Sequence, residues 1–193
     1  LGLKTLTIMK NALKLINQNR QTLKLEPINL DDLPLDDSKT YQLLQKGLTT
    51  AVFQLESRGI KEYIVKLKPN NFEDIITLIA LYRPGPLEMN MVETYIERKH
   101  GREEFSYGDE SVEKILDKTH GVIVYQEQVM QLAQEFSGFT LGEADILRRA
   151  MGKKIASEME EQKEPFITGA IEKGKNKRFA EGLIDQIEKF AGY

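Results

Sequence analysis

Apolar residues recur three and four positions apart along most of this chain, and no other feature constrains its fold as strongly. Residues 3–19 give the clearest case, with apolar side chains at Leu6, Met9, Leu13 and Ile16. This spacing places them on one face of an α-helix, because residues three and four apart lie one above the other there. The sequence therefore predicts an amphipathic helix at the start of the chain.

The same period, bounded by polar start signals and by glycine or proline stop signals, divides the rest of the chain into short helices. We expect further helices over residues 41–44, 51–56, 58–68, 72–82, 91–99, 111–118, 126–136, 141–152, 157–171 and 178–190. Residues 72–82 are apolar on nearly every side after their first turn, which predicts the most buried helix. Residues 122–125 form a short apolar run that is either strand-like or buried and extended. We therefore expect a mainly α fold of about eight to ten helices, with at most short strand-like segments.

Capping and turn residues set several of these boundaries. Thr140 and Glu143 form the capping box T-x-x-E, which starts a helix at residue 141. Gly152 favours the left-handed conformation that ends many helices, so we expect this helix to end there. After residue 82 the sequence RPGP interrupts the helical pattern, because prolines donate no backbone hydrogen bond and Gly85 permits a sharp turn.

The lack of cysteine and the small number of histidines exclude several kinds of site. With no cysteine there is no disulfide and no thiolate metal site, and two histidines are too few for a His-rich one. No run approaches the roughly 20 apolar residues of a membrane span. The first residues lack an initiator Met and look unlike a signal peptide, so we expect a cytosolic chain that begins inside a larger protein.

Four cations fall within seven consecutive residues, in a chain whose net charge is −3. Arg148, Arg149, Lys153 and Lys154 suit a polyanion such as a nucleoside triphosphate or a nucleic-acid backbone, since Arg presents a planar fork of donors and Lys a mobile point charge. The alternative is a solvated helix end, where cations complement the helix dipole and Arg149 pairs with Asp145 four residues earlier. Charge pattern by itself favours this alternative.

Two other groups of charged residues have structural alternatives of their own. Arg83 lies at the RPGP break, which either directs it toward a ligand or leaves it solvated at a helix end. Residues 98–102 (RKHGR) form a second basic run, to which the helix dipole again gives a structural role. Four aspartates between residues 31 and 37 invite a divalent-metal site. We favour turn and capping roles for them, because aspartate is common in turns and at helix starts.

Nine segments of the chain, in this order, resemble one protein family. They are LGLKTLT (1–7), PLDD (34–37), VFQLES (52–57), FED (72–74), LYRPGPL (81–87), RKHGR (98–102), VYQEQVM (124–130), LGEADILRRAMGKK (141–154) and KFAGY (189–193). Together they resemble the α subunits of bacterial DNA polymerase III, of the DnaE type, which are replicative polymerases. The resemblance runs from one end of the chain to the other. Its specificity comes from the order of the segments, since any one of them, such as RPGP, is weak.

The resemblance implies the multi-helix fingers domain of a C-family DNA polymerase over residues 39–193, truncated at its C-terminal end. Residues 1–38 would be a palm–fingers connecting helix and linker. The family's catalytic palm aspartates fall outside the chain, so it is expected to carry no catalytic residue and no metal site, and to be inactive by itself. The Mg²⁺ ions of the reaction would be bound by those palm residues.

By the same resemblance, Arg148 and Arg149 would clamp the triphosphate of the incoming dNTP, with Lys153 and Lys154 nearby, where charge develops during the reaction. Second-tier contacts with the nucleotide or the template would come from residues outside this cluster: Arg83, Lys99, Arg102, Gln126 and Gln128. The implied partners are primer–template DNA and dNTP in the cytoplasm, with no membrane. Other subunits of the polymerase III holoenzyme would bind regions outside this chain.

The residues by themselves leave two other functions open. A stand-alone helical DNA-binding module would bind duplex DNA tightly, with an affinity that falls steeply with salt. A protein-docking module would tolerate the loss of the basic cluster. The ordered family segments favour the polymerase over both.

Overall fold

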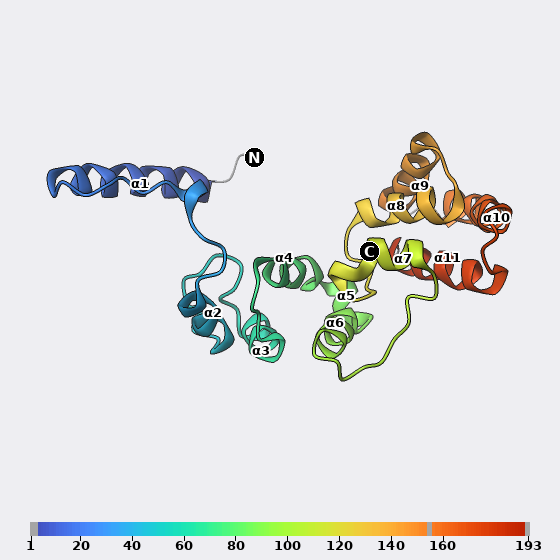
Figure 1. Cartoon of the computed structure of the whole chain (residues 1–193), viewed down its shortest axis with the longest axis horizontal. Coiled ribbons are helices and arrows are strands. Elements are labelled where there is room, and N and C mark those ends of the chain that lie inside the picture. Colours follow the sequence, from blue (N-terminus) through green and yellow to red (C-terminus); the bar gives the residue numbers. More distant parts are fainter. Residues whose placement is uncertain (1–3, 154–155, 192–193) are drawn as a thin grey trace. The chain divides into compact units, whose positions relative to one another are not determined.

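The computed structural model describes residues 4–153 and 156–191, which form eleven α-helices, two short 3₁₀-helices and no strand (Figure 1). The mainly α fold expected from the apolar period is confirmed. The elements are α1 (Lys4–Thr22), η1 (Leu30–Asp32), α2 (Ser38–Gln45), α3 (Arg58–Leu67), α4 (Phe72–Leu81), α5 (Pro84–Glu88), α6 (Met91–Lys99), α7 (Glu110–Leu116), η2 (Asp117–Thr119), α8 (Gln126–Ser137), α9 (Leu141–Lys153), α10 (Ala156–Glu172) and α11 (Lys177–Ala191). None of the helices in the described part is long and apolar enough to cross a membrane.

The chain falls into two compact units, and the second begins at Ser38. The first contains α1, η1 and the segment that joins them, which the Asn17 side chain holds together. The Asn17 amide donates to the Ile28 carbonyl at 2.8 Å, and its oxygen accepts from the Ile28 backbone N–H at 2.7 Å. The Arg20 Nε adds a hydrogen bond to the Glu26 carbonyl. These contacts fold the segment after α1 back along the last turns of the helix.

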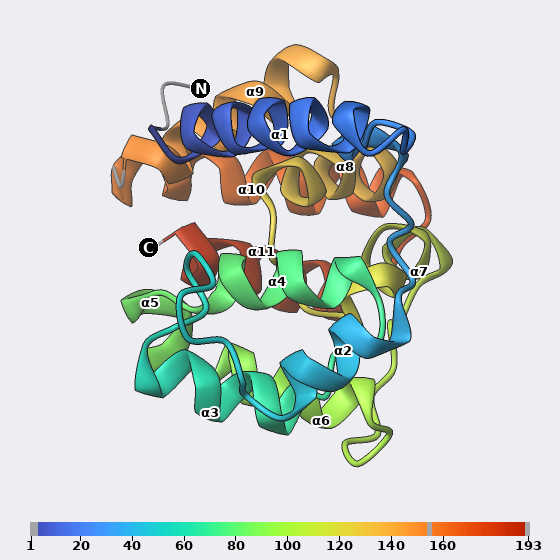
Figure 2. The same cartoon turned by 90° about the vertical axis from the view of Figure 1, so that its left-hand side faces the viewer.

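The second unit has two hydrophobic cores. Helices α2, α3, α4 and α6 surround the first core, where Ile64 and Leu78 are almost completely buried. Helices α7 to α11 surround the second core, where the rings of Phe136 and Phe166 stack 6.0 Å apart. Figures 1 and 2 show these two groups of helices.

Residues 122–125 connect the two cores. They are extended and belong to no strand, and the expectation of a buried extended segment is confirmed. Val122 and Val124 lie in the first core, whereas Ile123 lies in the second. Successive side chains of an extended chain point to opposite sides, so three residues anchor the segment in both cores.

Two of the predicted helix starts are confirmed by their hydrogen bonds. The backbone N–H of Thr140 donates to Glu143 Oε2 at 2.7 Å, and the N–H of Glu143 donates to Thr140 Oγ1 at 3.3 Å. This is the reciprocal capping box, and α9 begins at Leu141 as expected. The Asn71 side chain likewise accepts from the Asp74 N–H at the start of α4.

The helix predicted over residues 51–56 is wrong. The segment forms turns, because Ala51 and Gln54 adopt left-handed conformations with φ of 64° and 63°. A right-handed helix cannot continue through such residues. The Thr49 hydroxyl instead donates to the Leu55 carbonyl and closes the loop.

The expectation that residues 72–82 form the most buried helix is also wrong. Helix α4 leaves Phe72 44% exposed and Ile76 36% exposed. It packs mainly against α3 and α6, whereas α8 packs against α7, α9 and α10 and buries half of its residues. Hydrophobicity all around α4 therefore does not correspond to burial all around it.

Two helix boundaries differ from expectation because glycine occupies a helix interior. Gly85 does not form a sharp turn but is the second residue of the short helix α5. The break lies before it, and Pro84 starts α5 because its fixed φ already suits the first helical position. Helix α9 likewise continues through Gly152 to Lys153.

Candidate functional site

Helix α9 presents the arginines of the basic cluster on its outer face. Leu147 and Ala150 are completely buried in the second core. The helical period then turns Asp145, Arg148 and Arg149 away from that core. The Arg148 and Arg149 side chains are 36% and 55% exposed, so both are accessible to solvent.

Both arginines bind the same carboxylate. The Arg148 Nε and Nη2 donate to Asp145 Oδ1 at 2.9 and 2.8 Å, and the Arg149 Nε lies 3.1 Å from Asp145 Oδ2. The hydrogen bond from Arg148, and then the charges of both arginines, hold the pKa of Asp145 below its ordinary value. One carboxylate thus orients two guanidinium groups, and the three side chains together keep a net positive charge.

The two lysines of the cluster lie at the limit of the described residues. Lys153 is the last residue of α9, and the structure describes its backbone only. Lys154 lies outside the described residues. The predicted roles of both lysines stay predictions.

Lys99 has an internal partner. Its Nζ lies 3.0 Å from Asp74 Oδ2, and the two side chains are only 9% and 2% exposed. The same Nζ donates to Asn70 Oδ1 at 3.1 Å. The Tyr95 hydroxyl donates to the other oxygen of Asp74 at 3.2 Å. Through these contacts Lys99 joins α6 to α4.

Arg102 lies just after α6 and is half-exposed. Its Nε and Nη2 donate to the two carboxylate oxygens of Glu97, both at 2.7 Å. Arg83 is exposed in the residue before α5, and its guanidinium has no ion-pair partner among the described residues. Of these two arginines, Arg83 is therefore the more available to an anion.

The two glutamines at the start of α8 have different environments. Gln126 is exposed. Gln128 is 7% exposed, and its Oε1 accepts from the backbone N–H groups of Val124 and Tyr125 at 2.9 and 3.0 Å. Its Nε2 donates to Thr119 Oγ1 at 2.8 Å. Gln128 thereby holds the extended segment in place.

The predicted site residues of the second unit belong to helices around two different cores. Arg148 and Arg149 belong to a helix of the second core. Arg83, Lys99 and Arg102 lie on or beside helices next to the first core. Each group is therefore a separate candidate contact.

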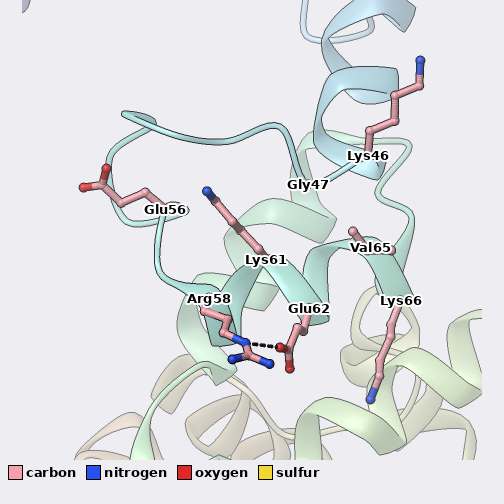
Figure 3. Close-up of a pocket in the computed structure, with 8 residues that line it drawn as sticks. All are labelled: Lys46, Gly47, Glu56, Arg58, Lys61, Glu62, Val65 and Lys66. Carbon is pink, nitrogen blue, oxygen red and sulfur yellow. Dashed lines mark hydrogen bonds and ion pairs between the residues drawn. The ribbon is translucent and has the colours of Figure 1, made fainter.

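Sequence reasoning missed a basic groove of about 650 Å³ beside α3 (Figure 3). Its cations are Lys46, Arg58, Lys61 and Lys66. The three on α3 fall within nine consecutive residues, which is a signal that the sequence contains. Glutamates interspersed with them conceal that signal, and only the tertiary structure adds Lys46 from the end of α2.

No group of three or more His, Asp or Glu side chains in the described part of the chain is arranged to hold a metal ion. The aspartates near η1 stabilise their own turn. The Asn29 amide donates to Asp32 Oδ2 at 2.9 Å, and the Asp31 N–H donates to Asn29 Oδ1 at 3.2 Å. The described residues therefore do not fit a site for catalytic Mg²⁺.

Comparison with known proteins identifies one family. Residues 5–174 match the sequence model of the bacterial DNA polymerase III alpha subunit finger domain. The chain is 55% identical to the DNA polymerase III subunit alpha of Pseudomonas aeruginosa and 54% identical to that of Escherichia coli K12, each over 198 aligned residues. It is 54% identical to the corresponding protein of Aquifex aeolicus over 193 residues. Each comparison covers 100% of this chain but only 17%, 17% and 16% of the relatives.

Proposed function

We propose that this chain, which belongs to the finger-domain family of bacterial DNA polymerase III α subunits, binds the triphosphate of the incoming dNTP in a replicative polymerase. The observation that carries the proposal is the exposed pair Arg148 and Arg149, held side by side on Asp145. The resemblance that runs through residues 141–154 supports the same helix.

The chemistry of α9 favours exchange of one anion for another. Asp145 offers a single charge to two guanidinium groups, and its contacts with them are solvent-exposed and weak. A triphosphate offers several charges and many acceptor oxygens, and its charge-assisted hydrogen bonds to arginine are strong. We expect the triphosphate to displace the carboxylate, while Lys153 and Lys154 add point charges at the end of the helix.

The other candidate residues either contact the ligand or support the fold in this proposal. Arg83, Arg102 and Gln126 are kept as contacts with phosphate or template, with Arg83 first because it has no ion-pair partner in the described part of the chain. Lys99 and Gln128 act through the fold, since their polar groups already bind neighbouring residues.

In this proposal the chain binds and positions the nucleotide and the DNA, and it does not itself hold the metal ions of the reaction. Its partners are primer–template DNA and dNTP in the bacterial cytoplasm. Catalytic Mg²⁺ belongs to the palm of the parent polymerase, and contacts with other holoenzyme subunits belong to other regions. Residues 1–38 would connect the fingers to the palm.

The decisive experiment is pre-steady-state incorporation of a single nucleotide by the full-length polymerase that carries this domain. Arg148→Ala and Arg149→Ala should each weaken dNTP affinity or slow incorporation about 10- to 150-fold, with primer–template affinity retained. The matched control is Arg178→Ala, which removes an exposed arginine on α11. Equal incorporation by all three variants and the parent enzyme would reject the proposed site and return the cluster to a helix-end surface.

A further inference from the structure

The loop formed by residues 48–56, between α2 and α3, has a strained backbone that its own hydrogen bonds hold. Ala51 and Gln54 adopt left-handed conformations, each of which costs about 1–2 kcal/mol in a residue other than glycine. The buried Thr49 side chain bonds to the Leu55 carbonyl, and the Ala51 N–H donates to Glu56 Oε2 at 3.2 Å. Such strain concentrates at functional sites, where a fixed loop shape is useful.

The 48–56 loop presents three large apolar side chains to solvent. Leu48 is 62% exposed, Phe53 is 55% exposed and Val52 is 37% exposed, whereas Leu55 is buried in the first core and anchors the loop. A single exposed apolar residue needs no explanation. Three on one short loop offer apolar area to a ligand, and Phe53 supplies an aromatic ring for stacking.

The basic groove adjoins this loop. Lys61 connects them, because its Nζ donates to Thr50 Oγ1 at 2.9 Å, and Figure 3 shows the backbone between Gly47 and Glu56 arching beside Lys61. Among the described residues, neither Lys46 nor Lys61 has a carboxylate partner.

The other two cations of the groove each have a carboxylate partner. Arg58 pairs with Glu62 at 3.0 Å, and Lys66 pairs with Glu93 at 2.6 Å. Lys46 and Lys61 are therefore the cations that an incoming anion meets without displacing a carboxylate.

The arrangement of the cations suits a chain of phosphates better than a single anion. In Figure 3 the side chains of Lys46, Lys61 and Lys66 extend in three different directions. They do not converge, as the ligands of one triphosphate would. Cations distributed along a groove, with an exposed aromatic residue on the adjoining loop, are typical of proteins that bind single-stranded nucleic acid.

We propose that the 48–56 loop and the basic groove bind an unpaired segment of DNA, with phosphates along Lys46 and Lys61 and a base stacked on Phe53. In a polymerase the unpaired DNA is the template strand ahead of the primer end. This inference rests on the proposed function, because it takes the chain to work on DNA. It concerns different residues from the triphosphate site on α9.

The test measures binding of the full-length polymerase to fluorescent primer–template DNA with a 12-nucleotide unpaired template overhang, and to the same duplex with blunt ends. Phe53→Ala should weaken binding of the overhang substrate about 5- to 150-fold, because stacking of one base on an aromatic ring is lost. Lys46→Gln combined with Lys61→Gln should lower the salt dependence of log K by about 1.4, at about 0.7 for each phosphate contact with a single strand. Binding of the blunt duplex should not change.

Controls separate the groove from general electrostatics and from loop damage. Lys177→Gln removes one positive charge from the exposed face of α11 and should leave overhang binding unchanged. Lys46→Gln alone keeps the Lys61–Thr50 bond and should lower the salt dependence by about 0.7. Urea unfolding of each variant checks that the fold is retained.

Unchanged overhang binding by folded Phe53→Ala and Lys46→Gln variants would overturn the inference and leave this surface to a protein partner. Equal loss on overhang and blunt substrates would overturn it too, since the contact would then lie on the duplex. Failure of the triphosphate site would give a different result, namely normal nucleotide incorporation by Arg148→Ala and Arg149→Ala. The two proposals can therefore fail independently.

Discussion

Lys99 and Asp74 form an ion pair of 3.0 Å in which both side chains are almost completely buried. The pair joins the end of α6 to the first turn of α4. Burial first, and the charge of Asp74 second, raise the pKa of Tyr95, so its hydroxyl stays protonated and donates to Asp74. A cation that looks available for DNA in the sequence therefore has its hydrogen bonds inside the protein.

Lys99→Met should destabilise the second unit strongly. The variant leaves the buried Asp74 carboxylate without its cation, and such losses cost about 3–5 kcal/mol in the free energy of unfolding. Urea denaturation followed by circular dichroism measures the change. The matched control is Arg102→Gln, whose partner Glu97 is exposed, and its midpoint should be close to that of the parent. Similar midpoints for the two variants would contradict a structural role for Lys99.

Gln128→Ala should destabilise the protein, whereas Gln126→Ala should not. Removal of the Gln128 side chain leaves the buried backbone N–H of Val124 and the partly buried N–H of Tyr125 without a partner. Each unsatisfied group costs about 1–3 kcal/mol. Gln126 is exposed, so its replacement should change stability by less than about 0.5 kcal/mol. Thermal and urea unfolding of both variants test the difference, and equal stability would assign Gln128 a role outside the fold.

Protonation of Asp109 should lower the free energy of unfolding at acid pH. Burial alone raises the pKa of Asp109, but hydrogen bonds from Lys175 and Ser111 outweigh burial and hold the pKa below its ordinary value. A lowered pKa in the folded state gives stability that is complete above the unfolded pKa, about 3.9, and is lost as pH falls through the folded pKa. Urea midpoints between pH 6 and pH 2.5 should therefore fall below about pH 4.

Asp109→Asn keeps a good helix N-cap for α7 but loses the ion pair with Lys175, so its urea midpoints should vary less with pH over the same range. Glu110→Gln is the neighbouring control, because the Glu110–Lys114 pair is exposed and solvent screens it. An unchanged acid dependence in Asp109→Asn would show that other carboxylates cause the loss of stability.

Two helical glycines should respond in opposite directions to alanine. A Cβ at Gly169 would lie 2.2 Å from the Ser137 carbonyl oxygen, so α10 or α8 must shift, at a cost of about 1–3 kcal/mol. A Cβ at Gly182 meets nothing within 4 Å, and alanine there should stabilise α11 by about 0.5–1 kcal/mol. Melting temperatures of Gly169→Ala and Gly182→Ala test the contrast. A shift in the same direction would mean that helix packing at Gly169 is looser than the structure shows.

Much of the fold follows from local chemistry that the sequence displays. The capping box of Thr140 and Glu143, and the Asn71 cap of α4, involve residues three apart, so their hydrogen bonds need no tertiary contact. The apolar period predicted most helices for the same reason. The segment of residues 51–56 could not be predicted in this way, because the turn closed by Thr49 and Leu55 and the left-handed Ala51 and Gln54 outweigh its helix signals.

The candidate site, like the fold, could be predicted only in part from the sequence. The sequence by itself determined which helix carries Arg148 and Arg149 and that Asp145 lies within reach of them, since these relationships are set by spacings of three and four residues. Only the tertiary structure decided which polar residues remain available, because burial depends on helices far apart in the chain. Packing of α6 against α4 hides Lys99, whereas the end of α2 brings Lys46 to the cations of α3.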